Sequence, residues 1–235
     1  MIRHDQPTIF GDTLIVAVSS VEDGPMNFKG NDCDEIRYNR SAFLDAAGVD
    51  PLVATLVQVA YEDTTNFTRY KVVEDDHAGE GILEPLSMTV ADGLVATRPE
   101  QALFLPLADC IGAVLYDPAA RVLMLSHLGR HSIEQDGGSR SINYLVNEFG
   151  CEPSDILVWL SPSVGKQSYP LQSFGGKSLH EVAAQQLMAS GVARSNIEVS
   201  HVDTAENQDY FSHSEFLAGD QPEDGRFAVV AMMVD

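Results

Sequence analysis

The chain has 235 residues, of which 44% are hydrophobic, and its formal net charge is −21. This size and composition fit a folded globular protein, and such an acidic surface repels phosphate backbones and anionic lipids, so we expect neither nucleic acid nor a membrane as a partner. No apolar run has the length of a membrane span and the first residues lack a signal-peptide pattern. Three widely spaced cysteines favour a reducing cytoplasm over a disulfide scaffold.

Segments that resemble strands and helices alternate along the chain. In order, the sequence predicts a strand within 9–20, a helix at 33–47, a strand at 52–61, a polar loop at 62–88 with one short strand at 68–73, a segment at 92–97 that leads into a turn, a central hairpin, a helix at 139–149, a strand at 156–160, a helix at 178–190, a strand at 196–201, a polar loop at 202–224 and a strand at 227–234. This succession predicts one compact, layered α/β (α+β) domain over residues 1–235, with mixed β-sheets flanked by about three helices.

Two of the predicted helices have clear end signals. Asp32 is a suitable N-cap for the first helix, and Gly48 is a suitable stop after it. In the last helix, Ser178 and Glu181 have the spacing of a capping box, in which each side chain bonds the backbone of the other.

The central hairpin is the most informative stretch of the sequence. Two nearly continuous apolar runs, Ile111–Leu115 and Val122–Leu125, flank an Asp-Pro turn signal at Asp117. Cys110 precedes the first run and His127 follows the second, so antiparallel pairing would make them neighbours at one end of the sheet. A nearby histidine activates a thiol or shares a metal with it. The alternative is a buried cysteine that acts as a small hydrophobic residue.

Taken in order, several short motifs resemble the YfiH-like family, whose members are described as multicopper polyphenol oxidases, laccase-domain proteins and purine nucleoside phosphorylases. The resemblance covers nearly the whole chain and rests on Met26-Asn27-Phe28, Gly30-Asn31-Asp32, Asn39-Arg40, Gln58-Val59-Ala60-Tyr61, Ala91–Thr97, Ala108-Asp109-Cys110, His127–Ser132, Ser161–Gly165, Tyr210–His213 and Gly225-Arg226-Phe227. The intact Ala-Asp-Cys motif is the most recognisable of these.

The resemblance implies a layered fold with mixed sheets, a zinc ion (copper in the oxidase interpretation) held by His, Cys and His, and phosphorolysis or deamination of purine nucleosides. The expected partners are therefore a purine nucleoside and phosphate. The site residues expected on this basis are Cys110, His127 and Asp109 for catalysis, Cys110, His127 and His131 for the metal, and Asp92, Arg130 and Gly165 for the substrate. Turn-stabilising or capping roles remain open for Asp92 and Asp109.

The sequence departs from the family at the expected metal site. The family's Gln-Val-His-Gly motif is replaced by Gln58-Val59-Ala60-Tyr61, and Ala60 cannot bind a metal, whereas a catalytic zinc normally has three protein ligands. His131 would be a substitute ligand if a helix placed it on the same face as His127, four residues earlier. His77, in the acidic run of the long loop, is a second substitute, although a solvated charge run is its default interpretation.

Three functions remain open at this point. The first is a nucleoside phosphorylase or deaminase with an altered metal site. The second is a non-catalytic family member that binds a nucleoside or a protein partner. The third is a hydrolase that uses Cys110 as nucleophile and His127 as base. Polyphenol oxidation is not expected, because multicopper chemistry needs clusters of histidines and the chain has seven scattered ones.

Overall fold

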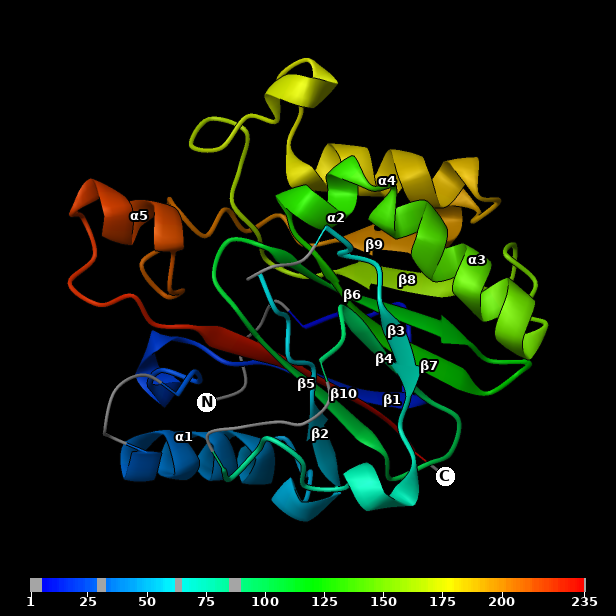
Figure 1. The fold of residues 1–235 in the computed structure, drawn as a ribbon, viewed down its shortest axis with the longest axis horizontal. Coiled ribbons are helices and arrows are strands. Elements are labelled where there is room, and N and C mark those ends of the chain that lie inside the picture. The colour runs from blue at the N-terminus through cyan, green and yellow to red at the C-terminus, as the bar shows by residue number, and fades with distance from the viewer. Residues whose placement is uncertain (1–5, 29–32, 62–64, 85–89, 235) are drawn as a thin grey trace.

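A computed structural model describes residues 6–28, 33–61, 65–84 and 90–234, and it contains two stacked mixed β-sheets with helices on the outside (Figure 1). The four-stranded sheet has the order β1 (Leu14–Val18), β10 (Phe227–Met233), β5 (Ala102–Leu107) and β2 (Ala54–Leu56). The six-stranded sheet has the order β3 (Tyr70–Val72), β4 (Gly93–Ala96), β7 (Val122–Leu128), β6 (Ile111–Asp117), β8 (Leu157–Leu160) and β9 (Ile197–Val199). The predicted mixed α/β fold class is confirmed.

Helices lie on the outer faces of both sheets (Figure 1). The α-helices of the described residues are α1 (Cys33–Ala46), α2 (Arg130–Glu134), α3 (Gly137–Phe149), α4 (Leu179–Ala189) and α5 (His213–Ala218). Short 3-10 helices are η1 (Val21–Asp23), η2 (Pro51–Val53), η3 (Asp75–His77), η4 (Gln172–Phe174) and η5 (Arg194–Asn196). In the described part of the chain, no helix is long and apolar enough to cross a membrane.

Alternation of side chains along the strands builds the layers. In β5, Leu103 and Leu105 face the core between the two sheets, whereas Phe104 faces the core beneath α1. In β6, Val114 faces the core between the sheets and Leu115 faces the core beneath α3 and α4. Because successive residues of a strand point to opposite faces, and both faces of the central strands are covered, these strands are apolar over most of their length and are buried on both sides.

Three residues carry the chain from one sheet to the other. β5 belongs to the four-stranded sheet and β6 to the six-stranded sheet, and only Ala108, Asp109 and Cys110 separate them. Asp109 has a φ of 73°, in the left-handed region that Asp tolerates better than most residues with a Cβ atom. This tight crossing places the Ala-Asp-Cys motif between the C-terminal end of β5 and the N-terminal end of β6.

Helix α2 was not predicted from the sequence, and the structure differs from the predicted elements in three further places. The predicted strand 52–61 is shortened to β2, because Asp50 caps the 3-10 turn η2 at its start. Strand β5, which contains Pro106, was not predicted. Proline lacks a backbone N–H, but β2 pairs with β5 only as far as Phe104, so β2 does not need a hydrogen bond from residue 106. Helix α5 lies inside the predicted loop 202–224.

Of the helix caps, one was missed in the sequence, one lies outside the described residues and one is confirmed. Helix α5 begins with a cap in which Ser212 accepts a hydrogen bond from the Glu215 backbone, and this Ser-x-x-Glu spacing was available in the sequence. The predicted cap Asp32 and the neighbouring Gly30 and Asn31 lie outside the described residues. Capping of α4 by Ser178 and Glu181 is confirmed.

Candidate active site

The hairpin places Cys110 and His127 beside each other, as predicted. β6 and β7 pair antiparallel with Gly112 opposite His127, and Asp117 stabilises the turn between them by accepting backbone hydrogen bonds from the next loop residues. A methyl group added at Gly129 would lie 2.8 Å from Cys110 Sγ and 2.9 Å from His127 Cε1. Both side chains therefore border one small volume at the end of the hairpin.

Tyr61 completes this cluster. Its hydroxyl lies 3.3 Å from His127 Nε2, and Tyr61 lines the same cavity as Cys110. The segment after β2 reaches this point because β2 runs parallel to β5 and therefore ends near the crossing that carries Cys110. Sequence reasoning missed Tyr61 as a site residue, and its position directly after Ala60 was the one available signal.

Burial keeps the cluster uncharged near neutral pH. Burial, together with the nearby charge of Asp109, raises the pKa of the Cys110 thiol to about 12. Burial also lowers the pKa of His127 to about 4. The charged forms of a thiol and an imidazole are both disfavoured in such surroundings. A thiolate–imidazolium pair, which the Cys110 hydrolase hypothesis requires, is therefore not supported.

The described residues do not fit the three-ligand zinc or copper site that the family resemblance implies. No three His, Cys, Asp or Glu side chains of the described chain come together as a metal site. His127 lies in β7, and α2 begins only at Arg130, so His127 and His131 do not share a helix face. His131 instead stacks on Phe67, with ring centroids 4.7 Å apart.

The other proposed ligand, His77, has a local structural role. It ends the 3-10 helix η3, where its Nδ1 accepts a hydrogen bond from the Glu74 backbone at 2.9 Å. His77 does not line the cavity that contains Cys110 and His127. Cys110, His127 and His131 therefore line one cavity without forming a three-ligand metal site among the described residues, and His77 lies outside that cavity.

Asp109 holds neighbouring segments in place. Its carboxylate accepts hydrogen bonds from Thr204 Oγ1 at 2.8 Å and from the Ser214 backbone at 2.7 Å. Its backbone carbonyl accepts from Ser163 Oγ at 2.6 Å and from the Val164 backbone at 3.0 Å. Both carboxylate oxygens are thus engaged, which favours the structural role that the sequence left open for Asp109.

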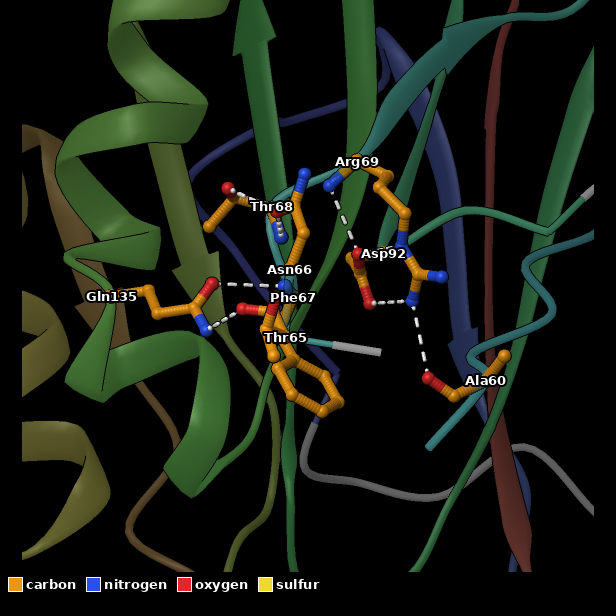
Figure 2. A network of polar contacts seen from close by, with 8 residues as sticks. All are labelled: Ala60, Thr65, Asn66, Phe67, Thr68, Arg69, Asp92 and Gln135. Atoms are coloured by element: carbon orange, nitrogen blue, oxygen red, sulfur yellow. Dashed lines mark hydrogen bonds and ion pairs between the residues drawn. The ribbon is translucent and has the colours of Figure 1, made fainter. Parts of the chain in front are cut away.

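Asp92 is fully buried and is paired with Arg69 (Figure 2). Arg69 donates to Asp92 from its backbone at 2.9 Å, from Nε at 2.7 Å and from the guanidinium at 3.0 Å. The same guanidinium donates to the carbonyl of Ala60 at 3.2 Å. Asp92 does not line the main cavity, so the structure places the expected substrate residue in the scaffold behind the site.

Gly165 permits a close approach, as its position in the predicted loop suggested. A Cβ atom at Gly165 would lie 1.9 Å from Asp203 Oδ2. However, Gly165 lines a separate cavity of about 310 Å³, together with His180 and His201. Its neighbour Val164 is the loop residue that borders the main cavity.

The main cavity has a volume of about 710 Å³. Besides Cys110, His127 and Tyr61, its polar lining residues are Asn27, Arg40, Gln58, Asp109, Arg130, His131, Tyr169, His213, Ser214 and Arg226. Arg130, one of the expected substrate residues, lines this cavity, and its Nε donates to the Tyr169 hydroxyl at 3.1 Å.

Basic side chains are concentrated around this cavity. Three arginines and three histidines line it, and Asp109 is the one acidic residue among its described lining residues. The whole chain, by contrast, has 35 acidic and 14 basic residues. Burial lowers the pKa of Arg40 to about 9, which still leaves this side chain charged at neutral pH. Arg40 and Arg226 were not predicted as site residues, although both lie in motifs that carry the family resemblance.

The family model of the multi-copper polyphenol oxidoreductase laccase proteins matches residues 18–177 and 172–234. The chain belongs to this family. The chain is 30% identical over 121 residues to purine nucleoside phosphorylase LACC1 of Mus musculus, an alignment that covers 50% of this chain and 27% of the relative. It is 25% identical over 139 residues to purine nucleoside phosphorylase YlmD of Bacillus subtilis, covering 59% of this chain and 48% of the relative. These alignments thus span about a quarter and about half of the relatives' lengths.

Solved structures show the same fold over nearly the full chain. YlmD from Geobacillus stearothermophilus superposes with a TM-score of 0.83 at 19% identity and covers 97% of this chain and 94% of that one. The Bacillus licheniformis hypothetical protein YfiH gives a TM-score of 0.79 at 19% identity, covering 94% and 93%. The expected family resemblance is therefore confirmed.

Proposed function

We propose that this chain binds a purine nucleoside together with phosphate in the main cavity and catalyses phosphorolysis of the nucleoside. The observation that carries the proposal is the group of basic side chains around a 710 Å³ cavity in a protein with a net charge of −21. Guanidinium groups bind phosphate oxygens through charge-assisted hydrogen bonds. The relatives named purine nucleoside phosphorylases support the choice of nucleoside as the second ligand.

In this reaction a phosphate oxygen forms a bond to the ribose C1′ atom. The bond from C1′ to the purine nitrogen breaks, and its electron pair leaves with the base, which then takes up a proton. The products are the sugar 1-phosphate and the free base. Arg226 and Arg130 are partly exposed cavity residues and would hold the phosphate and stabilise its charge during transfer.

His213 is the candidate proton donor for the leaving base. Its side chain is 45% exposed and lines the cavity, and its Nδ1 lies 2.9 Å from Asp224 Oδ1. A carboxylate in this position orients an imidazole for proton transfer through its other nitrogen. Tyr61, Cys110 and His127, which are uncharged, would contact the nucleoside by hydrogen bonds and need not change charge during the reaction.

The test is phosphate-dependent release of free base. The full chain is incubated with adenosine, inosine or guanosine, with and without inorganic phosphate, and the products are separated by chromatography. Arg226→Gln and His213→Gln should each lower kcat/KM at least tenfold, a loss of about 1.4 kcal/mol of transition-state stabilisation. Arg98→Gln is the control, since Arg98 is exposed, pairs with Asp75 and does not line the cavity. Absence of phosphate-dependent base release from all three nucleosides would overturn the proposal.

A non-catalytic binding protein is the second candidate, and the uncharged Tyr61–Cys110–His127 cluster favours it. Calorimetry distinguishes the two, because nucleoside binding without phosphate-dependent turnover supports the binding role.

The cavity is bordered by residues from Asn27 to Arg226, which supports treating residues 1–235 as one domain. The three free cysteines remain consistent with a cytoplasmic location, which we retain as part of the proposal.

A further inference from the structure

We propose that the Tyr61 hydroxyl takes the place of a metal ion between Cys110 and His127, and that this site binds its ligand without zinc or copper. The inference concerns the same cavity as the proposed function, but it does not depend on turnover. It rests on the position of Tyr61, on the surroundings of His127 and on the contacts that hold the Tyr61 segment.

The hydroxyl lies beside the two side chains that a metal would otherwise join. Tyr61 Oη lies 3.3 Å from His127 Nε2, and Tyr61, Cys110 and His127 line the same cavity. A phenolic hydroxyl both donates and accepts, so it can donate to His127 Nε2 and keep its lone pairs for another donor. The rings of Tyr61 and His127 meet edge to face, with an interplanar angle of 88°. The hydroxyl thus provides the partner of His127 Nε2 without an ion.

The other side of His127 lacks the support that a metal ligand normally has. A metal-bound histidine almost always donates its second ring N–H to a carboxylate, a carbonyl or water, which fixes the ring and raises its affinity for the metal. His127 Nδ1 is buried and has no hydrogen-bond partner among the described residues. The third protein ligand is also missing from the described residues. Among the described residues, His127 therefore has neither of these two features of a zinc site.

Figure 2 shows the polar network that anchors Ala60, the residue before Tyr61. Arg69 holds the Ala60 carbonyl directly before Tyr61 and is itself held by the buried Asp92. On the far side of the segment, Gln135 accepts from the Phe67 backbone at 2.9 Å and donates to the Thr65 carbonyl at 2.6 Å.

Phe67 adds an aromatic wall to the cluster. It packs against the Tyr61 ring at a centroid distance of 5.9 Å and stacks on His131. The ring of Tyr61 is therefore positioned on one side by the anchored Ala60 carbonyl and on another by Phe67. Because Tyr61 is still 54% exposed and lines the cavity, it can also contact a bound ligand.

The experiment measures metal content directly. Untagged chain is purified without added metal, incubated with excess zinc or copper, desalted and analysed by mass spectrometry. Tyr61→Phe removes the hydroxyl and keeps the ring. A variant that combines Ala60→His with Tyr61→Gly restores the Gln-Val-His-Gly order of the family. Cys110→Ala, added to each, reports whether any bound metal depends on the thiol.

We expect far less than one metal per chain in the unmodified protein and in Tyr61→Phe. The Ala60→His, Tyr61→Gly variant should approach one zinc per chain and lose it on addition of Cys110→Ala. Near-stoichiometric metal in the unmodified chain that is lost in Tyr61→Phe would overturn the inference, because Tyr61 would then be a metal ligand. Failure of a folded Ala60→His, Tyr61→Gly variant to bind zinc would also overturn it, because Tyr61 would not be what excludes the ion. Circular dichroism establishes that each variant is folded.

A second readout follows the imidazole itself. Nitrogen-15 NMR of the histidine side chains should show His127 as a neutral ring with its proton on Nδ1, and the Nε2 signal should shift in Tyr61→Phe. An Nε2 signal that responds to zinc in the unmodified chain contradicts the inference. Neither readout uses activity, so failure of phosphorolysis would count against the proposed function while leaving this result intact.

Discussion

Two polar clusters lie next to each other at one end of the six-stranded sheet, and they differ in how completely their groups are paired. In the first, the buried carboxylate of Asp92 is fully engaged by Arg69. In the second, Tyr61, Cys110 and His127 are uncharged, and His127 Nδ1 has no partner among the described residues. The two are joined by one hydrogen bond, from the His127 backbone to the Asp92 carbonyl at 2.7 Å.

The difference separates scaffold from site. A buried ion pair with every acceptor used gives a rigid support, and the loss of one partner leaves a buried charge uncompensated. A buried polar atom without a partner costs free energy, and a ligand can relieve that cost. Both clusters contain residues that the sequence marked as functional, but only the second one lines the cavity.

The largest expected effect is on the scaffold. Arg69→Ala leaves the buried Asp92 carboxylate unpaired and should lower the free energy of unfolding by about 3–5 kcal/mol. Arg98→Ala is the matched control, because the Arg98–Asp75 pair is exposed on both sides and its loss should leave the free energy of unfolding nearly unchanged. Urea denaturation measures both. Equal losses for the two variants would show that the Arg69–Asp92 pair is no stronger than a surface ion pair.

The second prediction concerns the stability of the folded chain at acidic pH. The pKa of His127 is lowered from 6.5 to about 4 in the folded chain, mainly by burial. Between these values the unfolded chain binds the extra proton, so stability rises with pH and is lost as the pH falls from 6.5 toward 4. A shift of this size corresponds to about 3 kcal/mol. Comparison of unfolding at several pH values with His127→Gln isolates this contribution, and parallel pH profiles for the two proteins would contradict it.

A smaller effect is expected from crowding the cluster. In Gly129→Ala the new methyl group would lie 2.8 Å from Cys110 Sγ and 3.3 Å from His127 Nε2. Overpacking of this kind costs about 1–3 kcal/mol, and it should weaken nucleoside binding more than a general loss of stability explains. Calorimetric titration at a temperature well below the unfolding transition tests this. Unchanged binding would place the nucleoside away from the cluster.

The last prediction concerns the chemical reactivity of the Cys110 thiol, with little effect on stability. Because burial raises the pKa of Cys110 from 9.0 to about 12, the thiolate fraction near pH 8 should fall about a thousandfold, and alkylation should slow accordingly. A variant that retains only Cys110 is compared with one that retains only Cys33, before and after denaturation. Rapid labelling of native Cys110 would revive the thiol hydrolase hypothesis.

The sequence by itself determined the local parts of this protein. Apolar runs around Asp117 specify the hairpin, and its antiparallel pairing alone brings Cys110 next to His127. Helix α4 follows from its capping residues. These features depend on neighbours within a short stretch of chain, where turn chemistry and side-chain periodicity are strong signals.

Only the tertiary structure decided which candidate residues share the cavity. Tyr61 meets His127 because β2 pairs in parallel with β5, and Arg226 reaches the same end because β10 pairs antiparallel with β5, with Phe227 opposite Leu107. The same packing turned Asp92 away from the cavity to pair with Arg69. Such contacts join residues far apart in sequence, and they are set by the stacking of two sheets rather than by any local pattern.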